Sequence, residues 1–159
     1  MRTLSVTIPE YERRFLVAKK SRKSGKPRWW TVNGQGLYNA TLHYTVRSRV
    51  TAYYHTYLSR YIKNQISEQD IELIRSLVYI GSEYKLSTSV DIYEIRRGKL
   101  PDCSNLWLWM KWFEDALQES GVIPDDDPDY IIESGRKRYH FVDSEDKRKL
   151  VFHIKFLKQ

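Results

Sequence analysis

SNLWLWMKWFEDALQES, residues 104–120, is the stretch that decides the fold. Its apolar side chains are dense, it contains no Gly or Pro, and Gly121 follows directly, as glycine often does just past a helix end. A helix this apolar must be covered by other parts of the chain. We therefore expect a buried helix here, with the rest of the fold built around it.

Two more helices and five strands are expected around this helix. Residues 38–63 lack Gly and Pro and carry apolar side chains three and four positions apart, which indicates a long amphipathic helix. Ser67, three before Asp70, marks the start of a shorter one. Alternating, β-branched stretches predict strands at 3–8, 87–97, 130–134, 138–142 and 149–157, with a turn at Gly135. This order predicts an α+β (mixed α/β) fold, a small mixed sheet packed against two main helices.

The composition is that of a single domain covering residues 1–159, with 41% apolar residues. No window of 18 apolar residues predicts a membrane span, and the first ten residues do not resemble a signal peptide. One cysteine, Cys103, excludes an intramolecular disulfide framework and a thiolate metal cage. A cytoplasmic protein with no membrane partner is expected.

The formal charge of +7 is concentrated at one end of the chain. Residues 1–28 hold all of the excess, and a basic loop spans about residues 13–30. Such a loop favours a polyanion, most simply nucleic acid, although a solubilising loop is the alternative. The candidate nucleic-acid-binding residues are Lys19, Lys20, Arg22, Lys23, Lys26, Arg28, Trp29 and, on the long helix, Arg47.

Tryptophans occur at two informative places. Trp29 and Trp30 end the basic loop, where they either stack on unpaired bases or serve as core or interface aromatics. The tryptophans of the buried helix are spaced too closely for one helix face, so some must meet a second surface, which favours a dimer interface; they are Trp107, Trp109 and Trp112.

Carboxylates lie at both ends of the same helix. Asp102 precedes it, where a simple cap is one reading, and Lys111 and Asp115 stand four apart as a potential ion pair. Beyond Gly121, the run PDDDPD at 124–129 is either a solvated loop or a divalent-cation site. Oxygen ligands without cysteines point to Mg²⁺ or Mn²⁺, and a basic protein with such a site is best explained as acting on phosphodiesters.

Residues 88–135 resemble the RusA-type Holliday junction resolvases, small endonucleases common in phages and prophages. The family pattern is Asp-x-Asp-Asn, a lysine, Asp-x-Leu four residues later, a glycine and an Asp-Asp pair. The matching positions are Asp102, Ser104 with Asn105, Lys111, Asp115 with Leu117, Gly121, and Asp125 with Asp126. The spacing from Lys111 to Asp126 agrees with that of the family.

The resemblance implies a homodimeric, Mg²⁺-dependent endonuclease that cuts four-way DNA junctions by paired incisions, in a bacterial or phage-infected cell, with no small-molecule cofactor. It implies that Asp102 and Asp126 bind the metal with help from Asp125, and that Lys111 is the catalytic lysine. Asp115 would support the lysine, and Asn105 would shape the loop before the helix.

Two departures from the family pattern keep other functions open. Ser104 stands where the family has a carboxylate, and six residues rather than three separate Asn105 from Lys111. A non-catalytic junction-binding or nucleic-acid-binding protein on the same fold is the alternative that Ser104 favours. A third is an interaction protein whose acidic loop meets a basic partner.

Overall fold

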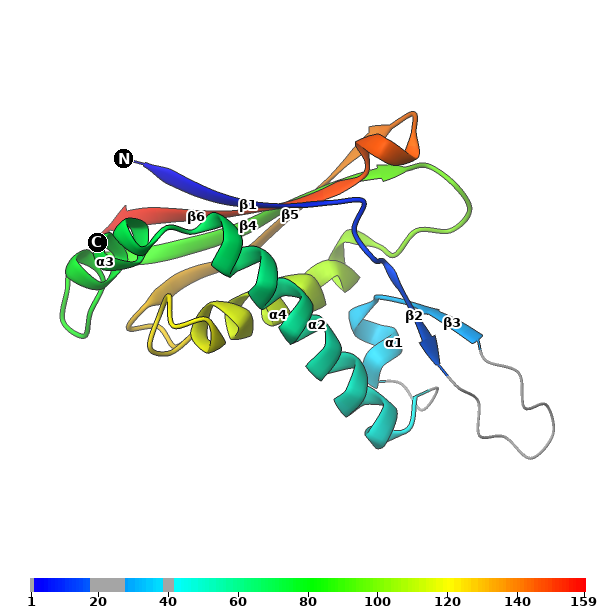
Figure 1. The fold of residues 1–159 in the computed structure, drawn as a ribbon, viewed down its shortest axis with the longest axis horizontal. Coiled ribbons are helices and arrows are strands. Elements are labelled where there is room, and N and C mark those ends of the chain that lie inside the picture. Colours follow the sequence, from blue (N-terminus) through cyan, green and yellow to red (C-terminus); the bar gives the residue numbers. More distant parts are fainter. Residues whose placement is uncertain (1, 18–27, 39–41) are drawn as a thin grey trace.

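A four-stranded sheet forms the framework on which the helices are placed (Figure 1). The computed structural model describes residues 2–17, 28–38 and 42–159. The strands lie in the order β1-β6-β4-β5. Their bounds are β1 Thr3–Pro9, β4 Tyr84–Ile95, β5 Ile131–Val142 and β6 Lys149–Lys158.

The sheet is mixed. β6 is antiparallel to both β1 and β4, whereas β4 and β5 are parallel. A parallel pair needs a crossover, and the chain supplies it through the 3₁₀ helix η1 (Cys103–Leu106) and the helix α4 (Trp107–Glu119). The expected α+β fold with a small mixed sheet is therefore confirmed.

The two main helices, α2 (Tyr44–Gln65) and α4, lie on one side of this sheet (Figure 1). The shorter α3 (Glu68–Leu77) follows α2 near one end of the sheet. Its start is capped as expected, because the Ser67 hydroxyl accepts a hydrogen bond from the Asp70 amide at 3.1 Å. No described helix is both long enough and apolar enough to cross a bilayer.

Alternation along the strands separates a helix-facing side from an open side. In β6, Phe152 and Ile154 are fully buried beneath the helices, and His153 points the other way, as predicted. The Phe113 ring of α4 stacks on Phe152 with ring centres 4.1 Å apart. The helix at 104–120 is thus the buried element that its composition predicted.

The long helix predicted at residues 38–63 begins later than expected. α2 begins at Tyr44, where His43 takes the cap position and its side chain accepts from the Thr45 amide. Before it lies a separate short helix, α1 (Gly34–Tyr38), which ends at the residue where the predicted helix begins. Local periodicity does not detect such a break, because the side chains on either side have helical spacing.

The expected turn at Gly135 is wrong, because residues 131–142 form one continuous strand. Gly135 has a φ of 102°, a value that L side chains rarely adopt. Its neighbour Ser134 pairs with Thr88, and the register of β4 against β5 shifts just after this pair. Gly135 therefore adopts the backbone conformation that a bulge within the strand requires, and it does not reverse the chain.

Part of the basic loop expected at about 13–30 is instead a ribbon. β2 (Arg14–Val17) pairs antiparallel with β3 (Arg28–Thr31), and this ribbon extends away from the main sheet (Figure 1). The strands were not predicted because four-residue strands carry too little alternation to be separated from their basic surroundings.

The tryptophans of α4 are covered within one chain. Trp109 and Trp112 are buried in the core, and Trp112 stacks on Tyr54 at 4.7 Å. Trp107 packs on α1, so closely that a Cβ at Gly34 would lie 2.1 Å from its Nε1. The second surface that the spacing required is therefore α1. The tryptophans give no support to a dimer, and the dimer stays a prediction.

Candidate functional site

The end of α4 turns the acidic loop back along the helix. Gly121 has a φ of 73°, and the amide of Val122 donates to the carbonyl of Leu117 at 3.0 Å, which closes the helix. Val122 and Ile123 are buried, and they hold the start of the loop against the core. The carboxylates that follow are consequently brought beside the solvent face of α4.

Lys111 joins this loop to the helix. Its Nζ donates to Asp115 Oδ1 at 2.7 Å and to Asp126 Oδ2 at 2.9 Å. Partial burial acts to lower the pKa of Lys111, but the bonds and charges of the two carboxylates outweigh it and raise this pKa above its ordinary value. The ammonium group is therefore protonated and lies between two acids. The fold brings Asp126, 15 residues further along the chain, into one cluster with Lys111 and Asp115.

His55, on α2, extends the cluster on the other side of Asp115. Its Nε2 lies 3.1 Å from Asp115 Oδ2, close enough for an ion pair although the angle is not that of a hydrogen bond. Its Nδ1 lies 3.2 Å from Glu119 Oε1. Burial raises the pKa of Asp115, but His55 and Lys111 outweigh this effect and lower it. The sequence pattern around His55 indicates no role for it, because its partner Glu119 lies 64 residues further along the chain.

We expect His55 to titrate above its ordinary pKa of 6.5, because the Asp115 carboxylate, and then Glu119, stabilise its charged form more than burial opposes it. A histidine whose pKa is raised by folding stabilises the fold below the unfolded pKa, and the contribution is lost as the pH rises through the folded value.

Asp115→Asn should lower the His55 pKa in an NMR titration of the imidazole Hε1 signal, assigned with His55→Gln. Asp129→Asn, which alters an exposed acid in the loop after α4, should leave it unchanged. Equal values in wild type and Asp115→Asn would contradict the contact.

Glu114 is a buried acid beside this cluster that sequence reasoning also missed. Its Oε1 accepts from the Thr88 and Ser134 hydroxyls, each at 2.5 Å. Burial raises the pKa of Glu114, and the two hydrogen bonds only partly offset that effect. A signal was present, since Glu114 lies four residues after Met110 and three before Leu117, on the buried side of the helix.

The acids of the loop differ in their surroundings. Asp125 and Asp127 are exposed and accept hydrogen bonds at 2.8 Å from backbone amides of the loop, those of Asp126 and Asp129. Asp126 is half-buried and turns toward Lys111. Of the four acids in this run, Asp126 is therefore the one that the fold directs into the cluster.

Asp102 lies elsewhere, at the cap position of η1, and makes no capping hydrogen bond with its side chain. It is exposed, as is Ser104, and Asn105 lines a hollow with it. η1 and the first turn of α4 separate Asp102 from Lys111 by up to roughly 15 Å of helical rise. Within residues 2–17, 28–38 and 42–159, no three His, Cys, Asp or Glu side chains are grouped to hold one metal ion. The assignment of Asp102 as a metal ligand stays a prediction.

The candidate nucleic-acid-binding residues are placed only in part. Lys19, Lys20, Arg22, Lys23 and Lys26 lie outside the described residues, as does the side chain of Arg28. The two tryptophans of the ribbon differ in burial. Trp30 is buried, as a core aromatic would be. Trp29 is 59% exposed, and the Arg14 guanidinium lies over its ring at 5.3 Å. Trp29 thus presents a largely exposed aromatic ring next to a cation.

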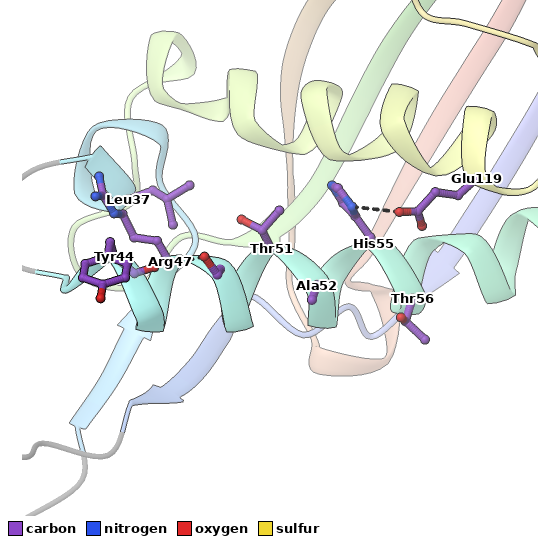
Figure 2. Close-up of a pocket in the computed structure, with 9 residues that line it drawn as sticks. Leu37, Tyr44, Arg47, Thr51, Ala52, His55, Thr56 and Glu119 are labelled. Carbon is purple, nitrogen blue, oxygen red and sulfur yellow. Dashed lines mark hydrogen bonds and ion pairs between the residues drawn. The ribbon is translucent and has the colours of Figure 1, made fainter.

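Arg47 lies in a groove of about 630 Å³ that runs along α2 (Figure 2). Figure 2 shows His55 in the same groove, directed toward Glu119 at the end of α4. The groove is lined by Leu37, Tyr44, Arg47, Ser48, Thr51, Ala52, His55, Thr56 and Glu119. His55 therefore connects this groove to the cluster around Lys111.

Two histidines of the sheet, His140 and His153, form hydrogen bonds with the same acid on the open side of the sheet. Asp91 of β4 bonds His140 Nε2 at 2.8 Å and His153 Nε2 at 2.7 Å, and His153 Nδ1 lies 2.9 Å from the Ser5 hydroxyl. Burial raises the pKa of Asp91, but the two histidines outweigh this effect and hold it below its ordinary value. β5 and β6 lie on either side of β4, and Asp91 bridges them.

Comparisons of the chain with protein-family models and with curated proteins gave no match. The resemblance to RusA-type resolvases consequently rests on the motif residues themselves.

Proposed function

We propose that this protein is a metal-dependent DNA endonuclease that acts on four-way junctions as a homodimer. The observation that carries the proposal is the position of Lys111 between Asp115 and Asp126, in the register of the RusA-type motif. Phosphodiester hydrolysis needs a fixed cation for the charge that develops on oxygen and a carboxylate that can hold a metal. This cluster contains both, on the surface of a basic protein.

The donors at the loop fit Mg²⁺ or Mn²⁺. Both ions prefer oxygen ligands, and Mg²⁺ is commonly held by one or two carboxylates together with water and substrate phosphate. Asp126 would hold the ion, with Asp125 next to it. The bound metal would supply Lewis-acid stabilisation of charge on the phosphoryl oxygens.

The protein's own groups have separable roles. Asp115 orients the Lys111 ammonium through the 2.7 Å contact, and the raised pKa of Lys111 keeps it protonated. Lys111 can then donate to a phosphate oxygen or to the leaving oxygen. Two strands must be cut symmetrically at a junction, and a twofold homodimer places one such cluster at each strand.

A second function, junction binding without incision, is favoured by Ser104. It is an exposed, neutral side chain at η1, where the family pattern has a carboxylate. A hydroxyl is a weaker metal ligand than a carboxylate, and its presence favours a protein that retains the DNA surface and has lost cleavage.

To test these functions, purified protein is incubated with a labelled four-way junction, a duplex and a single strand, each with and without Mn²⁺. We expect paired incisions in the junction that require the metal. Salt-sensitive binding without incision in either Mg²⁺ or Mn²⁺ supports the second function instead. No DNA affinity at about 100 mM salt contradicts both and favours an interaction protein, because phosphate contacts dominate nucleic-acid affinity.

A further inference from the structure

A cleft lies between the β2–β3 ribbon and the loop that follows β4. It has a volume of about 230 Å³, and its cations come from two distant parts of the chain. The segment around β2 contributes Arg13 and Arg14, and the loop after β4 contributes Arg97 and Lys99. The charge pattern of the sequence places the excess in residues 1–28 and does not connect it to the second pair.

The charge in this cleft is only partly neutralised. Among the described residues that line the cleft, Glu94 is the single acid, and Arg148 binds it at 2.6 Å in addition to Arg13 at 3.3 Å. Arg97 pairs with Glu145 only at 3.5 Å, and both side chains are more than half exposed, so this ion pair is weak. Within the described residues neither Arg14 nor Lys99 is paired with a carboxylate. The cleft therefore carries a net positive charge.

The cleft continues into a second hollow of about 300 Å³ that contains Asp102 and Asn105. Thr31, Lys99, Leu100 and Pro101 line both, so the two form one path along the loop. Two adjoining hollows accommodate a chain of anions better than a single ion. Arg14 lines the cleft, and the exposed Trp29 ring that it contacts lies next to the cleft as a stacking surface, which suits nucleic acid.

We propose that this cleft binds the backbone phosphates of a DNA strand, with Arg14 and Lys99 making the phosphate contacts, and leads that strand past Asp102. The proposal rests on the DNA substrate of the proposed function and adds the surface that holds it. Both side chains are exposed, so replacing them with glutamine changes the charge of the cleft without disturbing the core.

The test is a DNA-binding titration of the full chain in EDTA, where cleavage does not occur. Arg14→Gln combined with Lys99→Gln should weaken binding of a labelled four-way junction roughly 10- to 100-fold at about 100 mM salt. The slope of log affinity against log salt should fall by about 2, one for each lost phosphate contact. The control variant, Lys155→Gln with Lys158→Gln, makes the same charge change near the C-terminal end of β6. It should leave both the affinity and the salt slope near wild type.

Each outcome separates the cleft from the catalytic proposal. Wild-type affinity and slope in the Arg14/Lys99 variant, with wild-type protein binding DNA, would overturn the cleft alone. Reduced binding together with no incision by wild type in Mn²⁺ would support the cleft and overturn the nuclease. Competition by inorganic phosphate as strong as that by an oligonucleotide at equal phosphate concentration would show a site for a free anion and overturn strand binding.

Discussion

Asp126→Asn should abolish metal-dependent junction cleavage while leaving junction binding intact. The asparagine keeps the size of the side chain but removes the charge that would hold the metal and that now contacts Lys111 at 2.9 Å. We expect the cleavage rate to fall on the order of 10³-fold or more, because the electrostatic stabilisation of the transition state is lost. The affinity for DNA should stay the same or rise, since one negative charge is removed. Single-turnover cleavage and an EDTA binding titration measure the two effects.

The fold of this variant should be nearly unaffected. Lys111 is about half exposed, so its ion pair with Asp126 contributes no more than about 1 kcal/mol to stability. Asp129→Asn is the matched control, with the same charge change in the same loop. Cleavage by Asp126→Asn at the wild-type rate would rule out the site. An equal loss in Asp129→Asn would show a general charge effect of the loop.

Arg148→Met should cause the largest loss of stability. Arg148 bonds Glu94 through Nε at 2.6 Å and through a terminal nitrogen at 3.1 Å, and the Glu94 side chain is only 1% exposed. Removing one partner of a buried ion pair costs about 3–5 kcal/mol, because the other charge is left without compensation. Arg13, 3.3 Å from the same carboxylate, should keep the loss near 3 kcal/mol, or about 10 °C in Tm. Urea denaturation at pH 7 measures it.

A second variant isolates the charge. Arg148→Met combined with Glu94→Gln removes both partners and should be more stable than Arg148→Met alone. If the double variant is less stable than the single one, the loss is due to packing and not to an uncompensated carboxylate.

The same pair predicts how stability depends on pH. Burial raises the pKa of Glu94, but the hydrogen bonds of Arg148 and Tyr11 outweigh it and hold this pKa below its ordinary value of 4.5. A carboxyl whose pKa is lowered by folding stabilises the fold above the unfolded pKa, and this contribution is lost as the pH falls through the folded value. The difference in unfolding free energy between wild type and Arg148→Met should therefore be largest near neutral pH and shrink below about pH 4.5. A constant difference down to pH 3 would contradict the ionic origin.

The Lys111–Asp115 contact was predictable, but the geometry around it was not. Residues four apart on a helix are neighbours in any fold, so this contact depended only on the helix forming. The contact of Asp126 with Lys111 does not follow from spacing alone, since it requires Gly121 to reverse the chain and Val122 to be buried. His55 and Glu114 went unassigned because their partners come from other elements.

The pattern of residues by itself determined the capped start of α3, the buried α4 ended by Gly121, and the inward side of β6, because each depends on side chains a few positions apart. Tertiary structure alone decided which strands are neighbours, that Gly135 lies within β5, and that the α4 tryptophans are covered by one chain. It also joined Arg14 to Lys99 across one cleft. The physical reason is that pairing and burial depend on surfaces contributed by distant segments, and a local pattern carries no information about which of those surfaces meet.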